Sequence, residues 1–495
     1  MGKNVLKVGA AVLALALTVP AYAAVQNVKV SGDLKVQAVD RFNFALGSTD
    51  SPNIVKGAGG INSNQDLFLS IARVRLDAEL TDNVSLVVRL LNERVWDQES
   101  GALRTGTGNT TDSDLNIDLA YATLKEMFYS PLTLTIGRQE LHFGNDLIVG
   151  DVDTNGTAST ASSLVGTQGA VGDLGDLSAR KSFDALRATL DYSVADQPLT
   201  LDLVYAKVDE NTNNRADDIN LYGVNANYAL NEDHTVEAYF WLRDRKPGTA
   251  GTNTGVNDGS GVQSARGDRL STIGLRSVCN DIIDNLTLQA EGAYQVGTRV
   301  YSAVHNPNQS PNRALNSLLN VDAWALQIIA DYVFDGVANS PTLGFSYTHL
   351  SGDKTDTSGN YRGWDPMFEN QASGTIFNKI LGYSNANFFN LNGSIKPEIV
   401  DDLTIKANYY NIGLDRALTS TEGTWYTLTG INGGQQYQVT SKKGLGNEID
   451  LDFIYDYTED VQFGLNLGWF IPGEAFANEN RDTASQAIAT MTVAF

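Results

Sequence analysis

The stretch Leu132–Asp151, LTLTIGRQELHFGNDLIVGD, decides the fold. Leucine and isoleucine at positions 132, 134 and 136 alternate with threonine and glycine at 133, 135 and 137. This period of two predicts a strand with one apolar face. The strand carries Gly137-Arg138-Gln139 and then runs into the longest polar segment of the chain, about residues 143–181. This pattern is typical of the wall of a pore: a strand with two different faces, an arginine near its middle and a long loop after it.

The composition suits either two or three ordinary soluble domains or one large closed sheet. The 495 residues include 20 Tyr, 18 Phe and 46 Gly, which favour strands and turns. Mean hydropathy is −0.20, and no apolar run after the N-terminus reaches the roughly 20 residues of a membrane helix. A transmembrane barrel keeps the same average, because its strands are apolar on one face only.

The N-terminus has the features of a secretory signal peptide. Lys3 and Lys7 precede an apolar core, Val8–Val19, and Ala21-Tyr22-Ala23 forms a small-x-small cleavage site. We expect residues 1–23 to be cleaved and residues 24–495 to form a single outer-membrane barrel domain. The formal net charge of −23 argues against nucleic-acid binding. The one cysteine, Cys279, excludes an intramolecular disulfide.

After residue 25 the chain alternates apolar and polar residues in segments of about ten to fifteen residues. Eighteen such segments begin near residues 28, 66, 84, 115, 132, 182, 199, 218, 235, 267, 285, 320, 342, 385, 403, 447, 461 and 485. Short turns and long polar loops alternate strictly between them. We therefore predict an all-β fold, a transmembrane antiparallel barrel of about 18 strands with short periplasmic turns and long extracellular loops.

Parity within the segments supports a water-filled interior. In Val84–Val95, the even positions 84–90 are apolar, whereas Arg89 and Glu93 share the opposite face with Ser85. In residues 449–457, every odd position is apolar or aromatic and the even positions are mostly aspartate. A soluble β-sandwich also alternates, but its strands are shorter and its connections less regular. Charges repeated at the middle of long strands fit a lumen better than a packed interior.

The last segment ends the chain on an aromatic residue. Alternate residues from Ala487 to Phe495 are apolar, and a C-terminal phenylalanine on an amphipathic strand is the pattern read by the outer-membrane assembly machinery. The expected partners are therefore outer-membrane lipid and this machinery. Aromatic residues near the segment ends, such as Trp96, Tyr129 and Trp469, suit interfacial girdles.

Strand parity also assigns the charges that would act on a solute. The arginines expected in the positive arc of the constriction are Arg73, Arg75, Arg89, Arg138 and Arg187, and the acids expected opposite them are Glu448, Asp450 and Asp452. Arginine stays charged and holds carboxylates in two-point contacts, so the arc would bind anions. The alternative is that each charge is simply paired with a neighbour.

Arg138 departs from this parity. Strict alternation places it on the apolar face of Leu134 and Ile136, where an arginine at the bilayer midplane costs about 2–4 kcal/mol. Either the strand bulges at Gly137, or Arg138 lies above the apolar band. We favour the bulge, which would turn Arg138 into the lumen.

Three runs carry a family resemblance. IGRQELHFG, KSFDALRATLDYS and GNEIDLDFIYDYTEDVQFGLNLGWFIPGEAF resemble the alginate export family of Gram-negative outer-membrane porins. The family's Gly-Arg-Gln falls on residues 137–139, its Phe-Asp and following basic position on Phe183-Asp184 and Arg187, and its acidic strand on Glu448 and Asp450. The Phe-x-Pro-Gly-like ending falls on residues 470–473. The resemblance implies an 18-stranded porin, and in members studied for function an arginine-lined constriction, partly covered by loops, that secretes the anionic polysaccharide alginate.

Enzymatic and metal-binding functions find little support. The four histidines, His142, His234, His305 and His349, are scattered without a zinc, nucleophile or phosphate-loop motif. Residues 151–156, DVDTNG, match the first half of a calcium loop, but Ser162 replaces the bidentate glutamate at the twelfth position. We read this stretch as a hydrated turn and expect no catalytic residue, cofactor or metal.

The sequence thus predicts a passive channel for hydrophilic solutes, with anionic sugars or an alginate-like polysaccharide as the favoured cargo. A general or cation-preferring porin is the first alternative, because the acids outnumber the basic residues. A plugged barrel acting as an adhesin or structural surface protein is the second.

Overall fold

The computed structural model describes residues 26–47, 64–96, 115–129, 131–152, 175–192, 198–210, 218–246, 267–300, 318–353, 360–371, 373–378, 385–398, 400, 402–420, 423–427 and 436–495. The expected signal peptide, residues 1–23, lies outside these ranges. Asp153 and Asn155 of the DVDTNG turn also lie outside them.

Eighteen long strands form one antiparallel sheet, and β16 and β17 form a separate hairpin. The strands are β1 Asn27–Phe42, β2 Gln65–Thr81, β3 Val84–Val95, β4 Asn116–Leu124, β5 Leu132–Glu140, β6 Ser182–Asp191, β7 Leu199–Asp209, β8 Ile219–Ala229, β9 His234–Arg245, β10 Asp268–Cys279, β11 Leu286–Val300, β12 Leu318–Val333, β13 Thr342–Leu350, β14 Ala386–Ile395, β15 Leu403–Leu414, β16 Thr424–Thr427, β17 Gln436–Val439, β18 Gly444–Asp456, β19 Val461–Pro472 and β20 Ala484–Ala494. The short 3-10 helices are η1 Met127–Tyr129, η2 Gly175–Leu177 and η4 Asn478–Asn480. No helix in the described ranges has the length and apolarity needed to span a bilayer.

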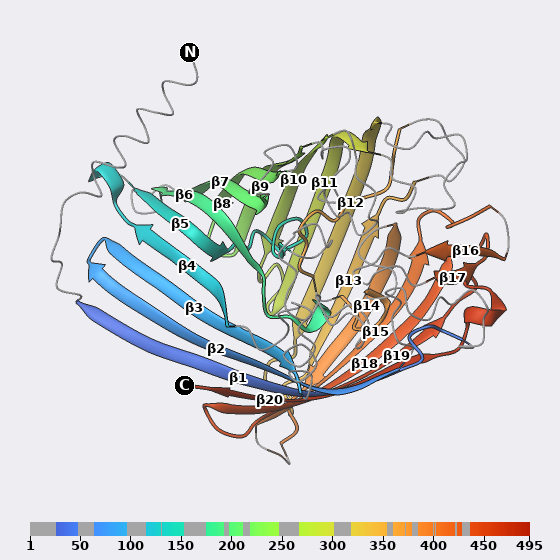
Figure 1. Ribbon diagram of the computed structural model, residues 1–495. Coiled ribbons are helices and arrows are strands. Elements are labelled where there is room, and N and C mark those ends of the chain that lie inside the picture. The colour runs from blue at the N-terminus through green and yellow to red at the C-terminus, as the bar shows by residue number, and fades with distance from the viewer. Residues whose placement is uncertain are drawn as a thin grey trace, which may run out of the picture.

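The sheet closes on itself where its first and last strands meet. β1 pairs with β2 on one side and with β20 on the other (Figure 1). At the seam Gly32 and Phe495 exchange main-chain hydrogen bonds of 3.0 and 2.9 Å. Closure leaves no sheet edge with unpaired N–H and C=O groups, which a bilayer could not satisfy. The predicted fold class is confirmed: a closed, 18-stranded antiparallel barrel with short periplasmic turns and long extracellular loops.

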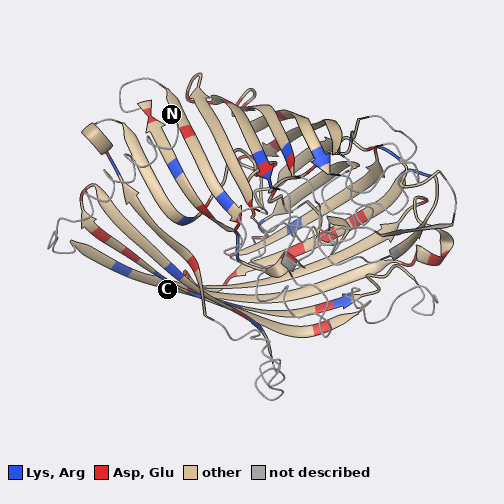
Figure 2. Cartoon of the chain, turned by 45° about the horizontal axis from the view of Figure 1, so that its top comes forward, with Lys and Arg blue, Asp and Glu red and all other residues tan. Residues whose placement is uncertain are grey.

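Alternation along each strand gives the wall two faces. In β10, Ile273 and Leu275 on the outward face are 54% and 57% exposed, whereas Thr272 on the inward face is fully buried. Large apolar side chains recur in this way on the outward face, where lipid rather than water covers them. Figure 2 shows basic and acidic residues interleaved along the strands and on the segments within the barrel.

Aromatic side chains mark both ends of the apolar band. Phe128 and Tyr129 are almost fully exposed in the turn between β4 and β5. At the loop end, Trp96 stacks on Phe68 with ring centroids 5.1 Å apart, and Trp324 stacks on the ring of His349 at 4.4 Å. Such rings have an apolar body and tolerate the polar headgroup region, so they suit the two membrane interfaces.

Candidate functional site: a lumen narrowed by two inward segments

The main buried cluster of the protein lies inside the barrel. It joins wall residues such as Phe183 and Trp241 to residues of two loop segments that fold inward. The first inward segment is residues 141–152, which follow β5. The second is residues 360–371 and 373–378, between β13 and β14. Both therefore occupy space that a water-filled pore would otherwise include.

The first inward segment is held by apolar packing against the wall. Its Leu141 and Val149 are fully buried. The ring of Phe143 lies 4.8 Å from that of Trp241 on β9, and the guanidinium of Arg187 on β6 lies 5.0 Å from the Phe143 ring centroid. Arg187, predicted as a pore residue, thus supports the inward segment as well as facing the lumen.

The two inward segments hydrogen-bond to each other. Phe368 N–H donates to the carbonyl of Ile148 at 3.0 Å, and the Phe368 carbonyl accepts from Gly150 N–H at 2.7 Å. Val149 and Phe368 form an isolated parallel bridge. The Phe368 ring packs edge-on against Phe183 of β6 at 5.8 Å. The second segment, which leaves the wall at β13, therefore reaches across the interior as far as β6.

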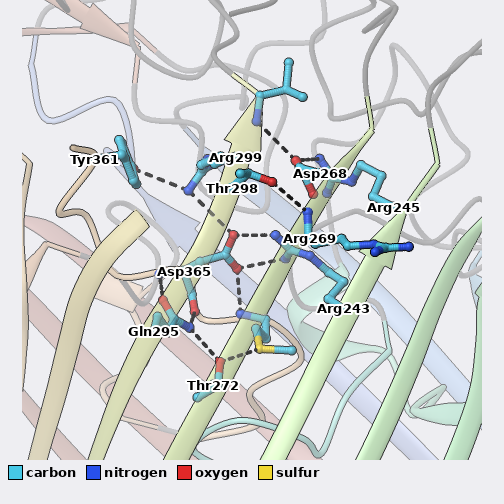
Figure 3. Close-up of polar contacts among 12 residues, drawn as sticks. Arg243, Arg245, Asp268, Arg269, Thr272, Gln295, Thr298, Arg299, Tyr361 and Asp365 are labelled. Atoms are coloured by element: carbon cyan, nitrogen blue, oxygen red, sulfur yellow. Dashed lines mark hydrogen bonds and ion pairs between the residues drawn. The ribbon is translucent and has the colours of Figure 1, made fainter. Parts of the chain in front are cut away.

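An ion-pair cluster fixes the middle of the second segment to the wall. Asp365 lies between Arg243 of β9 and Arg299 of β11 (Figure 3). Arg243 donates two hydrogen bonds to its carboxylate, at 2.9 and 2.7 Å, and Arg299 lies 3.6 Å from it. Gln295 brackets the Asp365 main chain, donating to its carbonyl at 2.6 Å and accepting from its N–H at 3.0 Å. Burial alone would raise the pKa of Asp365, but the attraction of both guanidinium groups outweighs it and holds the pKa below its usual range.

Two of the predicted pore acids hold the end of the same segment. The carboxylate of Glu448, on β18, accepts main-chain hydrogen bonds from Thr375, Ile376 and Phe377, at 2.5, 2.9 and 2.6 Å. Asp450 accepts from the Thr375 hydroxyl at 2.8 Å. A carboxylate that accepts several backbone N–H groups is a strong local restraint. Glu448 and Asp450 are therefore buried under the second segment instead of lining an open path.

The acids of β18 do not lie opposite all of the predicted arginines. β18 is separated from β2 by only three strands, β19, β20 and β1, so its acids do not lie opposite the arginines of β2. The point opposite β2 in an 18-stranded ring is nine strands away, whereas β6, which carries Arg187, is eight strands from β18 and nearly faces it. Asp452, the third acid, is part-buried and accepts a hydrogen bond from Asn466 of β19 at 2.7 Å.

A polar network joins the two segments to the start of β6. Lys181 donates to Asp151 at 3.0 Å and to the side chain of Asn370, which in turn donates to Asp146 at 3.2 Å. His142 bonds to Asp146 at 2.8 Å, and this bond raises the pKa of His142. Beside them, burial raises the pKa of Glu369 to about 8.

Four of the five predicted arginines face the lumen, and each is paired. Arg73 pairs with Asp33 at 2.9 Å, Arg75 with Asp77 at 2.8 Å, Arg89 with Asp118 at 2.5 Å, and Arg187 with Asp202 at 2.8 Å. Arg89 also contacts Glu140, the last residue of β5. Arg75 and Arg89 are direct cross-strand neighbours. Two positive charges at directly paired positions repel each other, and the acidic partners Asp77 and Asp118 compensate this repulsion.

Arg138 is on the outer face, so the expected inward bulge is wrong. Its cross-strand neighbour Asp184 alternates with Phe183 and Ala185, which are buried inside the barrel. Arg138 donates to both Asp184 oxygens, at 3.0 and 2.6 Å. Gly137 has the unusual φ of +125°, but the strand keeps its parity through this residue. The arginine is tolerated outside because it lies two residues from the loop end of β5, above the apolar band, and carries its own counter-ion.

Sequence reasoning missed the cluster around Asp365. Its members lie on two strands and on a segment without periodicity, so alternation gave no reason to connect them. A usable signal was the run Trp364-Asp365-Pro366-Met367-Phe368, because three large apolar residues in an extracellular loop need a place to be buried.

Comparisons with known proteins agree with this architecture. The family model described as Alginate export matches residues 58–490, most of the chain. The chain belongs to the alginate export family. No curated protein matches it. As a member of this family the chain is an outer-membrane β-barrel channel and not an enzyme.

Solved outer-membrane proteins share its fold. Pseudomonas aeruginosa OpdQ is 12% identical, with a TM-score of 0.53 over 96% of this chain and 99% of that one. Acinetobacter baumannii OccAB1 is 8% identical, with a TM-score of 0.52 over 96% and 98%, and OccAB2 is 12% identical, with 0.51 over 96% and 99%. At these identities the similarity to this alginate export family member concerns the fold alone.

Proposed function

We propose that the channel passes small hydrophilic solutes that carry carboxylates, with sugar acids as the favoured class. The observation that carries the proposal is the state of two lumen arginines. Arg73 and Arg187 each give only the Nε hydrogen to an acid, Asp33 and Asp202 respectively, and make no other hydrogen bond with the described residues. Both side chains stay about 30% exposed. Their remaining N–H groups are donors in the fork geometry that binds carboxylates.

The inward segments favour small solutes over free passage of a folded polymer. They contact the wall on β6, on β9, on β11 and on β18, and they hydrogen-bond to each other. A solute must pass between these segments and the wall that carries the arginines. Close passage brings a carboxylate within reach of a guanidinium beside the protein wall, where charge interactions are stronger than in bulk water.

An alginate-like polysaccharide is the second candidate, and the family match is what favours it. A single extended polyuronate strand carries carboxylates at regular intervals and would use the same arginines. Its passage would require the inward segments to move aside. Block of the channel by uronate monomers and by oligomers of increasing length separates the two cargoes.

Ion selectivity tests the common part of the proposal. The full chain is inserted in planar bilayers, and the reversal potential is measured in a KCl gradient. We expect anion preference in the wild type and a clear loss of it in the double variant Arg73→Gln/Arg187→Gln. The single variants Arg73→Gln and Arg187→Gln are also measured, and Lys406→Gln is their matched control, because it removes one exposed lumen cation on β15.

Each alternative function has its own outcome in this experiment. Cation preference in the wild type would replace the proposal by a general or cation-preferring porin, which the net charge of −23 supports. Absence of conductance in correctly folded protein would support a plugged barrel acting as an adhesin or structural surface protein. An equal change in the Lys406 control would show that selectivity follows total charge instead of Arg73 and Arg187.

A further inference from the structure

The outer face carries a continuous row of polar and charged side chains across seven strands, β5 to β11. Cross-strand neighbours follow one another in the order Arg138, Asp184, Lys207, Asn220, Asp244, Arg269 and Thr298. We call these residues the charged row. Each lies within two residues of the loop end of its strand. The row therefore circles this side of the barrel at the extracellular end of the wall.

A second row lies directly beneath the first, two residues further into the membrane. Its members, the apolar row, are Ile136, Leu186, Tyr205, Tyr222, Leu242, Ser271 and Val296. All but Ser271 are apolar or aromatic. Tyr205 and Tyr222 lie with ring centroids 5.2 Å apart, and the Tyr205 hydroxyl donates to Asn220 of the charged row at 3.2 Å. The step from one row to the next is the boundary between hydrocarbon and headgroups.

The charged row is built from ion pairs that keep basic groups at the surface. Arg138 pairs with Asp184 at 2.6 Å and Arg269 with Asp244 at 2.9 Å. Arg269 is nevertheless 68% exposed, so most of its guanidinium faces outward. Lys207 pairs with Asp218 at 2.6 Å, a residue just outside the row. Within the row itself there are three cations and two acids, and Asp218 and Glu210 add two acids beside Lys207.

A groove cuts through the two rows near Lys207. Its volume is about 410 Å³, and both rows line it: Asp184 and Lys207 from the charged row, and Ile136, Leu186 and Tyr205 from the apolar row. A headgroup held by the upper row would leave its acyl chain on the apolar residues below. Asp209 and Glu210 also line the groove, so a phosphate there needs a divalent cation beside it.

We propose that the charged row binds the phosphate groups of the acylated, phosphorylated saccharide lipid of the outer leaflet. Lys207 and Arg269 are the phosphate contacts, and the groove receives the lipid beside Lys207. Neighbouring strands lie about 4.8 Å apart, so Lys207 is roughly 10 Å from Arg138 and roughly 14 Å from Arg269 along the row. A lipid with more than one phosphate can therefore be held at two points. The exposed guanidinium of Arg269, the apolar row and the extracellular position select this lipid over an inner-leaflet phospholipid.

Native mass spectrometry of the full chain in detergent with Mg²⁺ tests the proposal. The probe is short-chain lipopolysaccharide, compared with the same lipid after removal of its phosphates and with phosphatidylglycerol. We expect bound lipopolysaccharide on the wild type and about tenfold weaker binding to Lys207→Gln/Arg269→Gln, because this variant loses both charge-assisted phosphate contacts. The matched control is Lys29→Gln/Lys406→Gln, which removes the same charge from the lumen face and should bind normally.

Folding is checked by heat-modifiable migration on gels. Arg269→Glu serves as the second variant, because its exposed side chain can be inverted without disturbing packing. It should also weaken lipopolysaccharide binding. Unchanged binding in both row variants would overturn the proposal. Equal binding of the dephosphorylated lipid, or of phosphatidylglycerol, would overturn it too.

Discussion

Removing the carboxylate of Asp365 should release the second inward segment from the lumen. Asp365→Ala deletes two hydrogen bonds from Arg243, one from the main chain of Met367 and the ion pair with Arg299. Arg243 is only 3% exposed, so it would be left as a buried charge without its main partner. Breaking a buried pair from one side costs about 3–5 kcal/mol.

This cost falls on the bound state of the segment and not on the barrel, because the wall strands keep their own hydrogen bonds. A change of 3–5 kcal/mol multiplies the ratio of released to bound segment by roughly 10²- to 5 × 10³-fold. Single-channel recordings should therefore show a higher conductance level that is rare or absent in the wild type. Heat-modifiable migration should remain normal.

Asp331→Ala is the matched control for this experiment. Asp331 lies on the inward face of β12, and among the described residues it makes no hydrogen bond or ion pair. Asp331→Ala removes one negative charge from the lumen, as Asp365→Ala does, but leaves the contacts of the second inward segment intact. Wild-type conductance in Asp365→Ala would refute the reasoning, and so would an equal gain in Asp331→Ala, because the effect would then follow charge alone.

Three further predictions follow from the same geometry. The pKa of Glu369 is about 8 in the folded protein against an ordinary 4.5, so docking of the second segment is strongest below pH 4.5 and weakens as pH rises to 8. Single-channel recordings from pH 5 to 9 should therefore show increasing release of the segment. The variant Glu369→Gln should abolish this pH dependence. Gly137→Ala should lower the yield of folded barrel in refolding assays by a cost of about 1–3 kcal/mol, since its φ is +125° and a Cβ would lie 2.1 Å from the Ala120 carbonyl oxygen. Deleting Phe495 removes both hydrogen bonds to Gly32 and the expected assembly signal, so the heat-modifiable fraction in outer membranes should fall, whereas Phe495→Tyr should assemble normally.

The wall could be predicted from the sequence because a period of two is a local signal. Val84–Val95 begins and ends at the residues that alternation gave, and Leu199–Asp209 and Thr342–Leu350 begin where alternation placed them. Register follows from the same signal, because a slip of one residue would turn every charge of a strand toward lipid. Among the described strands, only β16 and β17, which form a hairpin outside the wall, were not anticipated.

The interior could not be predicted in the same way. Loop residues such as Trp364 and Phe368 are buried by strands far away in the chain, and no local pattern names those strands. Glu448 shows the consequence. Its parity correctly placed it inside the barrel, but its role depends on three N–H groups of a loop about 70 residues earlier. Arg138 shows a different error. Strict alternation correctly placed it on the outer face of the barrel, and the bulge that we expected to turn it into the lumen is absent.

The acidic composition of the chain is a poor guide to the field that a solute meets. Glu448 and Asp450 are 0% and 2% exposed beneath the second inward segment, and Asp365 is buried between arginines. These acids act on the protein itself, because they hold the segment in place and are screened from the solution by it. By contrast, Arg73 and Arg187 keep about 30% of their side chains exposed. Exposure, and not the count of charges, decides which of these groups a solute meets, and release of the segment should uncover Glu448 and Asp450 and shift selectivity toward cations at the same time as conductance rises.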